Sequence, residues 1–145
     1  MSYKVKIIGD LKNQQKTWDL VHFLCIQHGM REENADVFAI AVGEAYGNGL
    51  QYSPDNYSEL IMEFQTETIV AEIENVGDEI NFEEIEKFNK NQDFQQYKDG
   101  KLGIPMIKAL VDDVLFTRKN GKNKIVLSKI IKSNKNVLKG ENNEN

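Results

Sequence analysis

The feature that most constrains the fold of this chain is a change of hydrophobic period after the turn-like tetrapeptide Ser53-Pro54-Asp55-Asn56. Beyond it, apolar and polar residues alternate in two successive stretches. Alternation with period two is typical of a strand that buries one face. The pattern predicts two strands of a hairpin or meander, whose buried positions are Leu60, Met62 and Phe64 in the first and Ile69, Ala71 and Ile73 in the second.

The segment before that turn predicts one strand and two helices. Residues 3–8 alternate weakly and are followed by a Gly-Asp pair, which suits a first strand. Apolar residues then recur at helical spacing within residues 13–29, and Gly29 suits the C-cap position of this helix. Glu33 or Asn34 begins a second predicted helix, whose apolar positions run from Val37 to Leu50.

The last third of the chain predicts a helix and a hairpin. Residues 104–114 have helical character, and Pro105 is tolerated in the first turn. Residues 115–119 and 124–130 resemble strands joined across Asn120-Gly121, a strong hairpin signal. Together the elements predict an α+β two-layer sandwich, with helices on one face of a mostly antiparallel mixed sheet. We assign residues 1–132 to one domain and residues 133–145 to a polar, disordered tail.

The composition restricts the environment and the partners of the chain. Its net charge is -5 and its pI is about 5.1, which makes it a poor general binder of nucleic acid. Its single cysteine, Cys25, excludes an intramolecular disulfide and fits a reducing compartment. No apolar stretch has the length of a signal peptide or a membrane span. We therefore expect a cytoplasmic protein with no direct nucleic-acid partner and no membrane partner.

Polar residues continue the apolar stripe of the second predicted helix. Val37 and Ala41 lie on one face of this helix. Glu44 and Asn48 continue the same face and place a carboxylate and an amide on it. Because a buried polar group needs a partner, a ligand is one explanation of this pattern. The alternative is that the helix end simply leaves the core there.

Two glycine-containing segments flank a long polar stretch between Gly77 and Gly100. The first is E-N-V-G-D-E-I at residues 74–80, where a strand ends and a turn follows. The second is D-G-K-L-G at residues 99–103, directly before a helix, where free amides and the helix dipole suit a phosphate. A polar loop of this length is typical of a functional segment. Taken singly, the first segment is better explained as an ordinary strand-ending turn, whereas a flexible loop with a glycine N-cap explains the second as well as a phosphate site does.

The polar face of the second predicted helix and the two glycine-containing segments follow one another in a fixed order. With these three features in that order, residues 10–130 resemble the GHKL superfamily of ATP-binding domains, which has the Bergerat-type fold. Within it, the chain looks most like the bacterial anti-sigma-factor serine kinases. A-V-G-E-A-Y-G-N-G-L-Q-Y resembles that branch's E-A-x-x-N-A-x-x-H motif, and N-V-G-D-E-I-N resembles its D-x-G-D-x-F-D segment. The most specific match is G-K-L-G-I-P-M-I-K-A-L-V-D-D-V, which resembles G-G-L-G-L-x-L-I-x-x-L-M-D-E-V.

The resemblance implies a role for each matching residue. Glu44 would be the general base that deprotonates the attacking hydroxyl, and Asn48 would supply an oxygen ligand to Mg2+. The implied cofactors are ATP and Mg2+, with residues 81–100 forming a lid, and the chemistry would be phosphoryl transfer by positioning and charge neutralisation. The implied nucleotide-binding residues are Asn48, Asn75, Gly77, Gly100, Lys101, Leu102 and Gly103.

The sequence departs from the family pattern mainly at the base end of the implied pocket. Asn75 stands where the family has an aspartate that reads adenine, so one acceptor oxygen is kept and the charge is lost. A family threonine on the last strand falls at Asn123 or Lys124. Three further positions of the family motifs also differ, namely Gly49, Tyr52 and Lys101. The residues for phosphoryl transfer and metal binding match, so the phosphate end is better preserved than the base end.

The resemblance predicts a serine/threonine-protein kinase that binds Mg-ATP, sequesters a sigma factor and phosphorylates a serine on an anti-anti-sigma (antagonist) protein. Two alternatives stay open: a degenerate, non-catalytic partner-binding regulator, and a switch kinase that activates a phosphatase. Relatives commonly dimerise through the sheet edge and first helix, here near residues 4–8 and Trp18, whereas a monomer would place Trp18 in the core. His22 and His28 have no partners at metal-ligand spacing, so helix-surface or core roles are expected for them.

Overall fold

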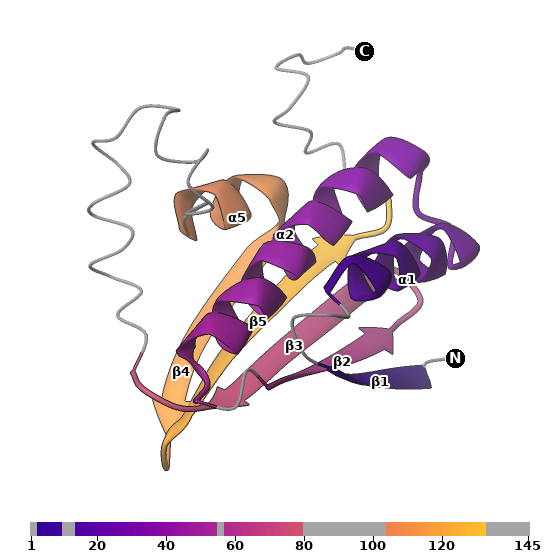
Figure 1. Ribbon diagram of the computed structural model, residues 1–145. Helices are drawn as coiled ribbons and strands as arrows, with labels where there is room; N and C mark the ends of the chain where they lie inside the picture. Colours follow the sequence, from indigo (N-terminus) through magenta and orange to yellow (C-terminus); the bar gives the residue numbers. More distant parts are fainter. Residues whose placement is uncertain (1–2, 10–13, 55–56, 80–103, 133–145) are drawn as a thin grey trace, which may run out of the picture.

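The computed structural model describes residues 3–9, 14–54, 57–79 and 104–132, and its elements follow the predicted order (Figure 1). The first half contains β1 (Tyr3–Gly9), α1 (Gln14–Gln27) and α2 (Glu32–Tyr52). The two alternating stretches form β2 (Ser58–Phe64) and β3 (Thr68–Val76). The last elements are α5 (Ile104–Leu110), β4 (Asp113–Lys119) and β5 (Lys122–Ile130). The predicted lid at residues 81–100 and the predicted tail at residues 133–145 lie outside the described residues.

The five strands form one sheet in the order β1-β2-β3-β5-β4, and each neighbouring pair is antiparallel. Helices α1, α2 and α5 lie on one face of this sheet (Figure 1). The α2 helix packs against β2, β3 and β5 and also contacts α1 and α5. These observations confirm the predicted α+β two-layer sandwich. None of the described helices is both long and apolar enough to cross a membrane.

The side chains that face the helices confirm the strand prediction. The apolar positions predicted for β2 and β3 are all buried, and Ile125 and Leu127 of β5 join them in the core. Intervening residues of β2 and β3 face the opposite side and are partly buried, except for the exposed Val76 at the end of β3. The sheet therefore has an inner face, covered by the helices, and an outer face that no described element covers.

The α1 helix ends as the glycine signal predicts. Gly29 has a φ of 98°, which side chains other than glycine rarely adopt. Its amide donates to the Ile26 carbonyl at 3.0 Å, and the Met30 amide donates to the Cys25 carbonyl at 3.0 Å. This pair of hydrogen bonds is a Schellman motif, which satisfies the last carbonyls of the helix.

The predicted helix at residues 104–114 is wrong at its C-terminal end, because α5 stops at Leu110 and β4 begins at Asp113. The Asp112 amide donates to the Ser128 carbonyl at 2.9 Å, and the Ile130 amide donates to Asp112 Oδ2 at 2.7 Å. Pairing with β5 therefore replaces the last helical turn. The fully buried Lys129 also donates from Nζ to the Leu110 carbonyl at 3.2 Å, which satisfies a carbonyl at the end of α5.

The hairpin predicted at Asn120-Gly121 is confirmed. Both residues have positive φ, 53° and 77°, as the central residues of a type I′ turn require. The turn pairs Lys119 with Lys122, so β5 begins two residues earlier than the predicted start at Lys124. This register decides which face each later residue of β5 occupies.

Candidate functional site

The polar stripe predicted on α2 leaves the core gradually. Val37 and Ala41 are buried against the sheet, whereas Glu44 and Asn48, one and two turns further along, are half-buried. The end of α2 and the end of β3 lie at the same end of the sheet (Figure 1). The helix therefore presents a carboxylate and an amide at the edge of the core, where part of each side chain remains accessible.

Burial changes the acidity of Glu44. Desolvation raises the pKa of its carboxyl from an ordinary value of 4.5 to about 7, since the charged form loses hydration. Both protonation states are therefore populated near neutral pH. A carboxyl with this pKa can accept a proton from a substrate and release it again without a large energy cost, which is the property of a general base.

A close approach of the two long helices positions this part of α2. Gly43 faces Trp18 of α1, and a Cβ atom at Gly43 would come within 2.9 Å of Trp18 Cδ1. No real Cβ tolerates that distance without a shift of its neighbour, so glycine is required for this packing. Trp18 itself is half-buried and packs against the core. The residue before Glu44 thus fixes how deeply α2 is set against α1.

Asn75 occupies the inner face at the end of β3. Its side chain is 4% exposed, and it lies directly opposite Asn123 of β5 in the strand register. Asn123 is likewise buried on the inner face, whereas Lys124 faces outward. Of the two positions that the sequence left open for the residue on the last strand, the structure therefore pairs Asn123 with Asn75.

The two amides differ in how they are held. Arg118 Nη1 donates to Asn123 Oδ1 at 2.9 Å, and Asn123 Nδ2 donates to the Asp78 carbonyl at 2.8 Å. Both polar atoms of the Asn123 amide are therefore bonded. Asn75 Nδ2, in contrast, is buried without a hydrogen-bond partner among the described residues. An unsatisfied buried amide is costly, which points to a partner supplied from elsewhere.

Gly77 is fixed by the same group of residues. Its amide donates to the Gly121 carbonyl at 3.1 Å, and its carbonyl accepts from Arg118 Nη1 at 3.0 Å. The turn after β3 is thus held by the β4–β5 hairpin. The sequence reasoning missed Arg118, which no motif marked. The two-residue turn at Asn120-Gly121 nevertheless places it opposite Asn123, so the hairpin register was the available signal.

The remaining predicted site residues cannot be compared in the same way. Gly100, Lys101, Leu102 and Gly103 lie outside the described residues, and α5 begins directly after them at Ile104. The part of the chain that the structure describes contains no group of three or more His, Cys, Asp and Glu side chains suited to a metal ion.

The surroundings of the cysteine and of the two histidines are those of residues that stabilise the fold. Cys25 is fully buried, and desolvation raises the pKa of its thiol to about 12, as expected for an inert core cysteine. His22 Nε2 lies 2.6 Å from Asp36 Oδ1 across the α1–α2 contact. His28 Nε2 lies 3.3 Å from the Gln65 carbonyl, and its ring contacts that of Phe64.

Comparison with protein families identifies the kind of domain to which these elements belong. The family model of the histidine kinase-like ATPase domain matches residues 16–129, which is most of the chain and includes α2, β3 and the β4–β5 hairpin. The chain belongs to this family. Membership supports nucleotide binding, with ATP as the ligand and a kinase or ATPase reaction as the activity. A comparison with curated proteins returned no match.

Proposed function

We propose that this histidine kinase-like ATPase domain is a cytoplasmic serine kinase of the anti-sigma type. It binds Mg-ATP, sequesters a sigma factor and phosphorylates a serine on an antagonist protein. The family match supports the nucleotide, and the motif resemblance supports the branch. The observation that carries the kinase proposal is Glu44, a half-buried carboxyl whose pKa is raised to about 7.

The proposed chemistry assigns the proton transfer to Glu44. Its carboxylate accepts the proton of the serine hydroxyl as the serine oxygen forms a bond to the γ-phosphorus. The bond from that phosphorus to the bridging oxygen breaks, and ADP leaves with the bond electrons. Proton transfer of this kind contributes roughly 10²–10⁴-fold to a rate when the pKa lies near the working pH.

Asn48 is the residue that would hold Mg2+. The donor set fits this ion, because Mg2+ uses one or two protein oxygens and completes its shell with water and substrate phosphates. The Asn48 amide offers such an oxygen one turn beyond Glu44, and it is only half-buried. When bound, Mg2+ neutralises phosphate charge.

The proposal is tested by transfer of phosphate from labelled ATP. Purified protein is incubated with Mg-ATP and an antagonist protein, and phosphoserine is detected by mass spectrometry. We expect loss of transfer in Glu44→Gln. Transfer should persist in the natural chain and in the control variant Glu32→Gln, which replaces an exposed acidic residue at the start of the same helix. Equal transfer by Glu44→Gln, or no transfer by the natural chain, would contradict the kinase assignment.

A second candidate function is a regulator that binds its partner without turnover. The observation in its favour is Asn75, whose buried amide replaces the carboxylate that the family uses to read adenine. An amide makes a weaker hydrogen bond than a carboxylate, so nucleotide affinity would fall. In this form the domain would keep the surface for its partners while the pocket loses its catalytic use. A switch kinase that activates a phosphatase would share the same pocket.

A thermal-shift titration separates the two candidates. A ligand at 100 times its dissociation constant stabilises the folded state by about 2.7 kcal/mol. We therefore expect a rise in Tm with millimolar Mg-ATP or Mg-ADP if the pocket works as a kinase site. Absence of a shift with both nucleotides would favour the regulator. Gel filtration of the same samples would show whether the protein is a homodimer or a monomer.

A further inference from the structure

The outer face of the sheet carries a hollow at the β4–β5 hairpin. Its volume is about 560 Å³, and it extends over β5 from β4 to the end of β3. The strand register places Thr117, Lys124 and Glu74 side by side across these three strands. Lys119 and Lys122 pair beyond them, next to the hairpin turn. The hollow lies on the opposite side of the sheet from the buried Asn75 and Asn123.

The hollow is positively charged in an acidic protein. The outer-face part of its lining contains three lysines, Lys119, Lys122 and Lys124, and one acidic residue, Glu74, so the formal sum is 3 - 1 = +2. Arg118 also lines it, but its guanidinium is held by Asn123 of the inner face and by the Gly77 carbonyl. The whole chain has a net charge of -5. A local excess of this sign attracts carboxylates and steers an acidic partner during its approach.

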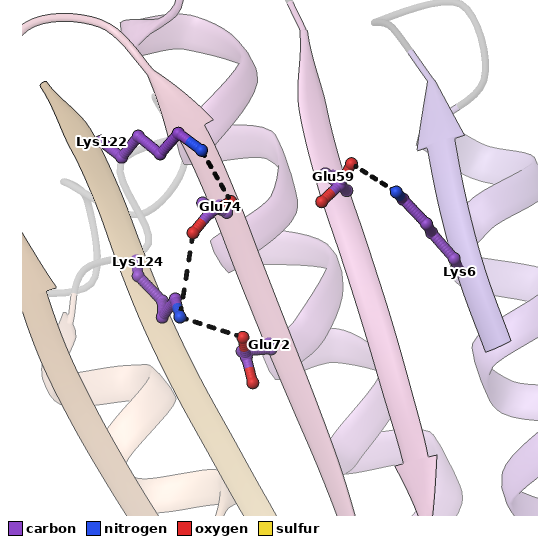
Figure 2. A network of polar contacts seen from close by, with 6 residues as sticks. All are labelled: Lys6, Glu59, Glu72, Glu74, Lys122 and Lys124. Atoms are coloured by element: carbon purple, nitrogen blue, oxygen red, sulfur yellow. Dashed lines mark ion pairs between the residues drawn. The ribbon is translucent and has the colours of Figure 1, made fainter. Parts of the chain in front are cut away.

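Ion pairs hold two of these lysines over the sheet. Lys124 Nζ lies 3.2 Å from Glu72 Oε1 and 3.8 Å from Glu74 Oε2, and Lys122 Nζ lies 3.9 Å from Glu74 Oε1 (Figure 2). The hydrogen bond and charge of Glu72 raise the pKa of Lys124, so this side chain stays protonated. Side chains already restrained in this way lose less entropy when a ligand binds.

Exposed apolar side chains border the same hollow. Leu115 of β4 and Val76 of β3 are each 58% exposed, and both lie in phase with the outer-face residues of their strands. Val76 is directly opposite Lys122, and Leu115 is two residues before Thr117. Large exposed apolar side chains beside a charged site suit a ligand that carries aliphatic as well as acidic groups.

The centre of the outer face argues against two other occupants. Glu59 and Glu63 of β2 and Glu72 and Glu74 of β3 form an acidic strip of four carboxylates there. Glu59 pairs with Lys6 of β1 at 3.2 Å, and Glu72 and Glu74 pair with the lysines of β5 (Figure 2). A nucleic acid leaving the hollow along the sheet would meet these carboxylates. A second copy stacked about a central two-fold axis would bring acidic strip against acidic strip.

We propose that the outer face of the β4–β5 hairpin is a docking site for an acidic, aliphatic peptide segment of a protein partner. Carboxylates of that segment pair with Lys119, Lys122 and Lys124, and its aliphatic side chains contact Leu115 and Val76. A partner whose acidic segment is followed by a basic one gains further, because the basic residues then reach the acidic strip on β2 and β3. The site does not include the nucleotide pocket and does not depend on catalysis.

The test uses the full chain and a fluorescein-labelled peptide of alternating Glu and Leu, with binding followed by fluorescence anisotropy. We expect saturable binding that weakens as NaCl is raised from about 50 to about 300 mM. The double variant K119E/K122E should bind about tenfold or more weakly. The matched control Lys16→Glu, which reverses an exposed lysine at the start of α1, should bind within about twofold of the natural chain.

Several outcomes would overturn the docking site. They are unchanged binding by K119E/K122E, equal binding of a peptide of alternating Lys and Leu, and tighter binding of single-stranded DNA than of the acidic peptide. A dimer in sedimentation runs that K119E/K122E dissociates would instead assign the face to a second copy. If K119E/K122E fails to fold by circular dichroism, the neutral variant K119Q/K122Q decides, with an expected loss of about threefold.

Discussion

At the hairpin end of the sheet, neighbouring residues of the same strands serve two different surfaces. On the inner face, β3 and β5 place the buried amides of Asn75 and Asn123 opposite each other. On the outer face, the adjacent residues Glu74, Lys122 and Lys124 are partly exposed and joined by ion pairs. The alternation of side chains along a strand is enough to separate these environments by one residue.

The difference between the faces is one of dielectric surroundings. A polar atom on the inner face is removed from water, so an unmade hydrogen bond there costs about 1–3 kcal/mol. A charge on the outer face remains solvated, and a single ion pair contributes about 0–1 kcal/mol. Single substitutions should therefore have large effects on the inner side, whereas the outer face depends on several charges acting together.

The largest effect is expected at Glu44, the inner-side carboxyl with the raised pKa. Glu44→Gln keeps the size of the side chain and removes the base, so phosphate transfer should fall by roughly 10²–10⁴-fold. The nucleotide should still bind, because Glu44 is assigned to the proton and not to the phosphates. Rates with labelled ATP and thermal shifts with Mg-ADP measure the two quantities separately. Loss of both together would assign Glu44 a binding role instead.

The second largest effect is expected at Lys129 of β5, the inner-face counterpart of the outer-face Lys124. Lys129 is fully buried on the inner face and donates to the Leu110 carbonyl at the end of α5. Lys129→Ala removes this bond and leaves a cavity, which should lower the free energy of unfolding by about 2–4 kcal/mol. Urea unfolding followed by circular dichroism measures it. A loss below about 0.5 kcal/mol would show that a lysine on the inner face of β5 contributes no more to the free energy of unfolding than one on the outer face.

Most of the fold could be predicted because its elements carry local signals. Alternation in β2 and β3, the glycine after α1 and the Asn-Gly turn are each contained within a few residues. The end of α5 could not be predicted in this way. Residues 111–114 continue the helical spacing of apolar residues, although valine and aspartate are weak helix formers. Pairing of Asp112 with Ser128 and Ile130, which are distant in sequence, ends the helix and leads into β4.

The third prediction concerns pH and again separates Glu44 from the solvated acids. Its folded-state pKa, about 7, lies above the ordinary value of 4.5, so the stability it contributes is complete below pH 4.5 and is lost as pH rises through 7. At about 1.4 kcal/mol per unit of pKa shift, Glu44 changes the free energy of unfolding by at most about 3 kcal/mol. Its partial exposure to solvent reduces this change to about 1–2 kcal/mol.

Glu44→Gln does not titrate and provides the measurement. The unfolding free energy of the variant, relative to the natural chain, should rise by about 1–2 kcal/mol between pH 5 and pH 8 in urea titrations. An unchanged difference between these two pH values would show that the carboxyl is already ionised in the folded protein, and would weaken its assignment as a base near neutrality.

The fourth prediction restores a charge on the inner face. On the proposed assignment of Asn75 to the base end of the pocket, Asn75→Asp offers the base a carboxylate acceptor, and hydrogen bonds to charged groups are roughly twice as strong as neutral ones. Affinity for Mg-ATP should therefore rise by about tenfold, which corresponds to about 1.4 kcal/mol. Isothermal titration calorimetry measures it, with Asn123→Asp as the control in which the bonded amide is changed. Equal affinity in Asn75→Asp and the natural chain would place the base away from Asn75.

The sequence predicts some parts of the candidate site and not others. Helical periodicity was enough to place Glu44 and Asn48 on one face of α2, but the raised pKa of Glu44 depends on tertiary burial that no local pattern contains. The choice between Asn123 and Lys124 depended on strand register, in which a shift of one residue exchanges the faces. Phase with Ile125 and Leu127 would have selected Asn123. The bond from Arg118 to Gly77 spans 41 positions and has no local signal.

The smallest effect is expected for a single ion pair of the outer face. Lys124→Gln breaks the contacts with Glu72 and Glu74 but leaves all three positions in contact with water. The free energy of unfolding should change by less than about 0.5 kcal/mol, and this small change should vanish at about 1 M NaCl, because salt screens solvated charges. Urea titrations at low and high salt measure it, with Lys129→Ala as the inner-face reference. If Lys124→Gln lowered the free energy of unfolding as much as Lys129→Ala does, the outer face would have to be covered in solution. The larger effect expected for inner-face substitutions would then hold only for a chain without that cover.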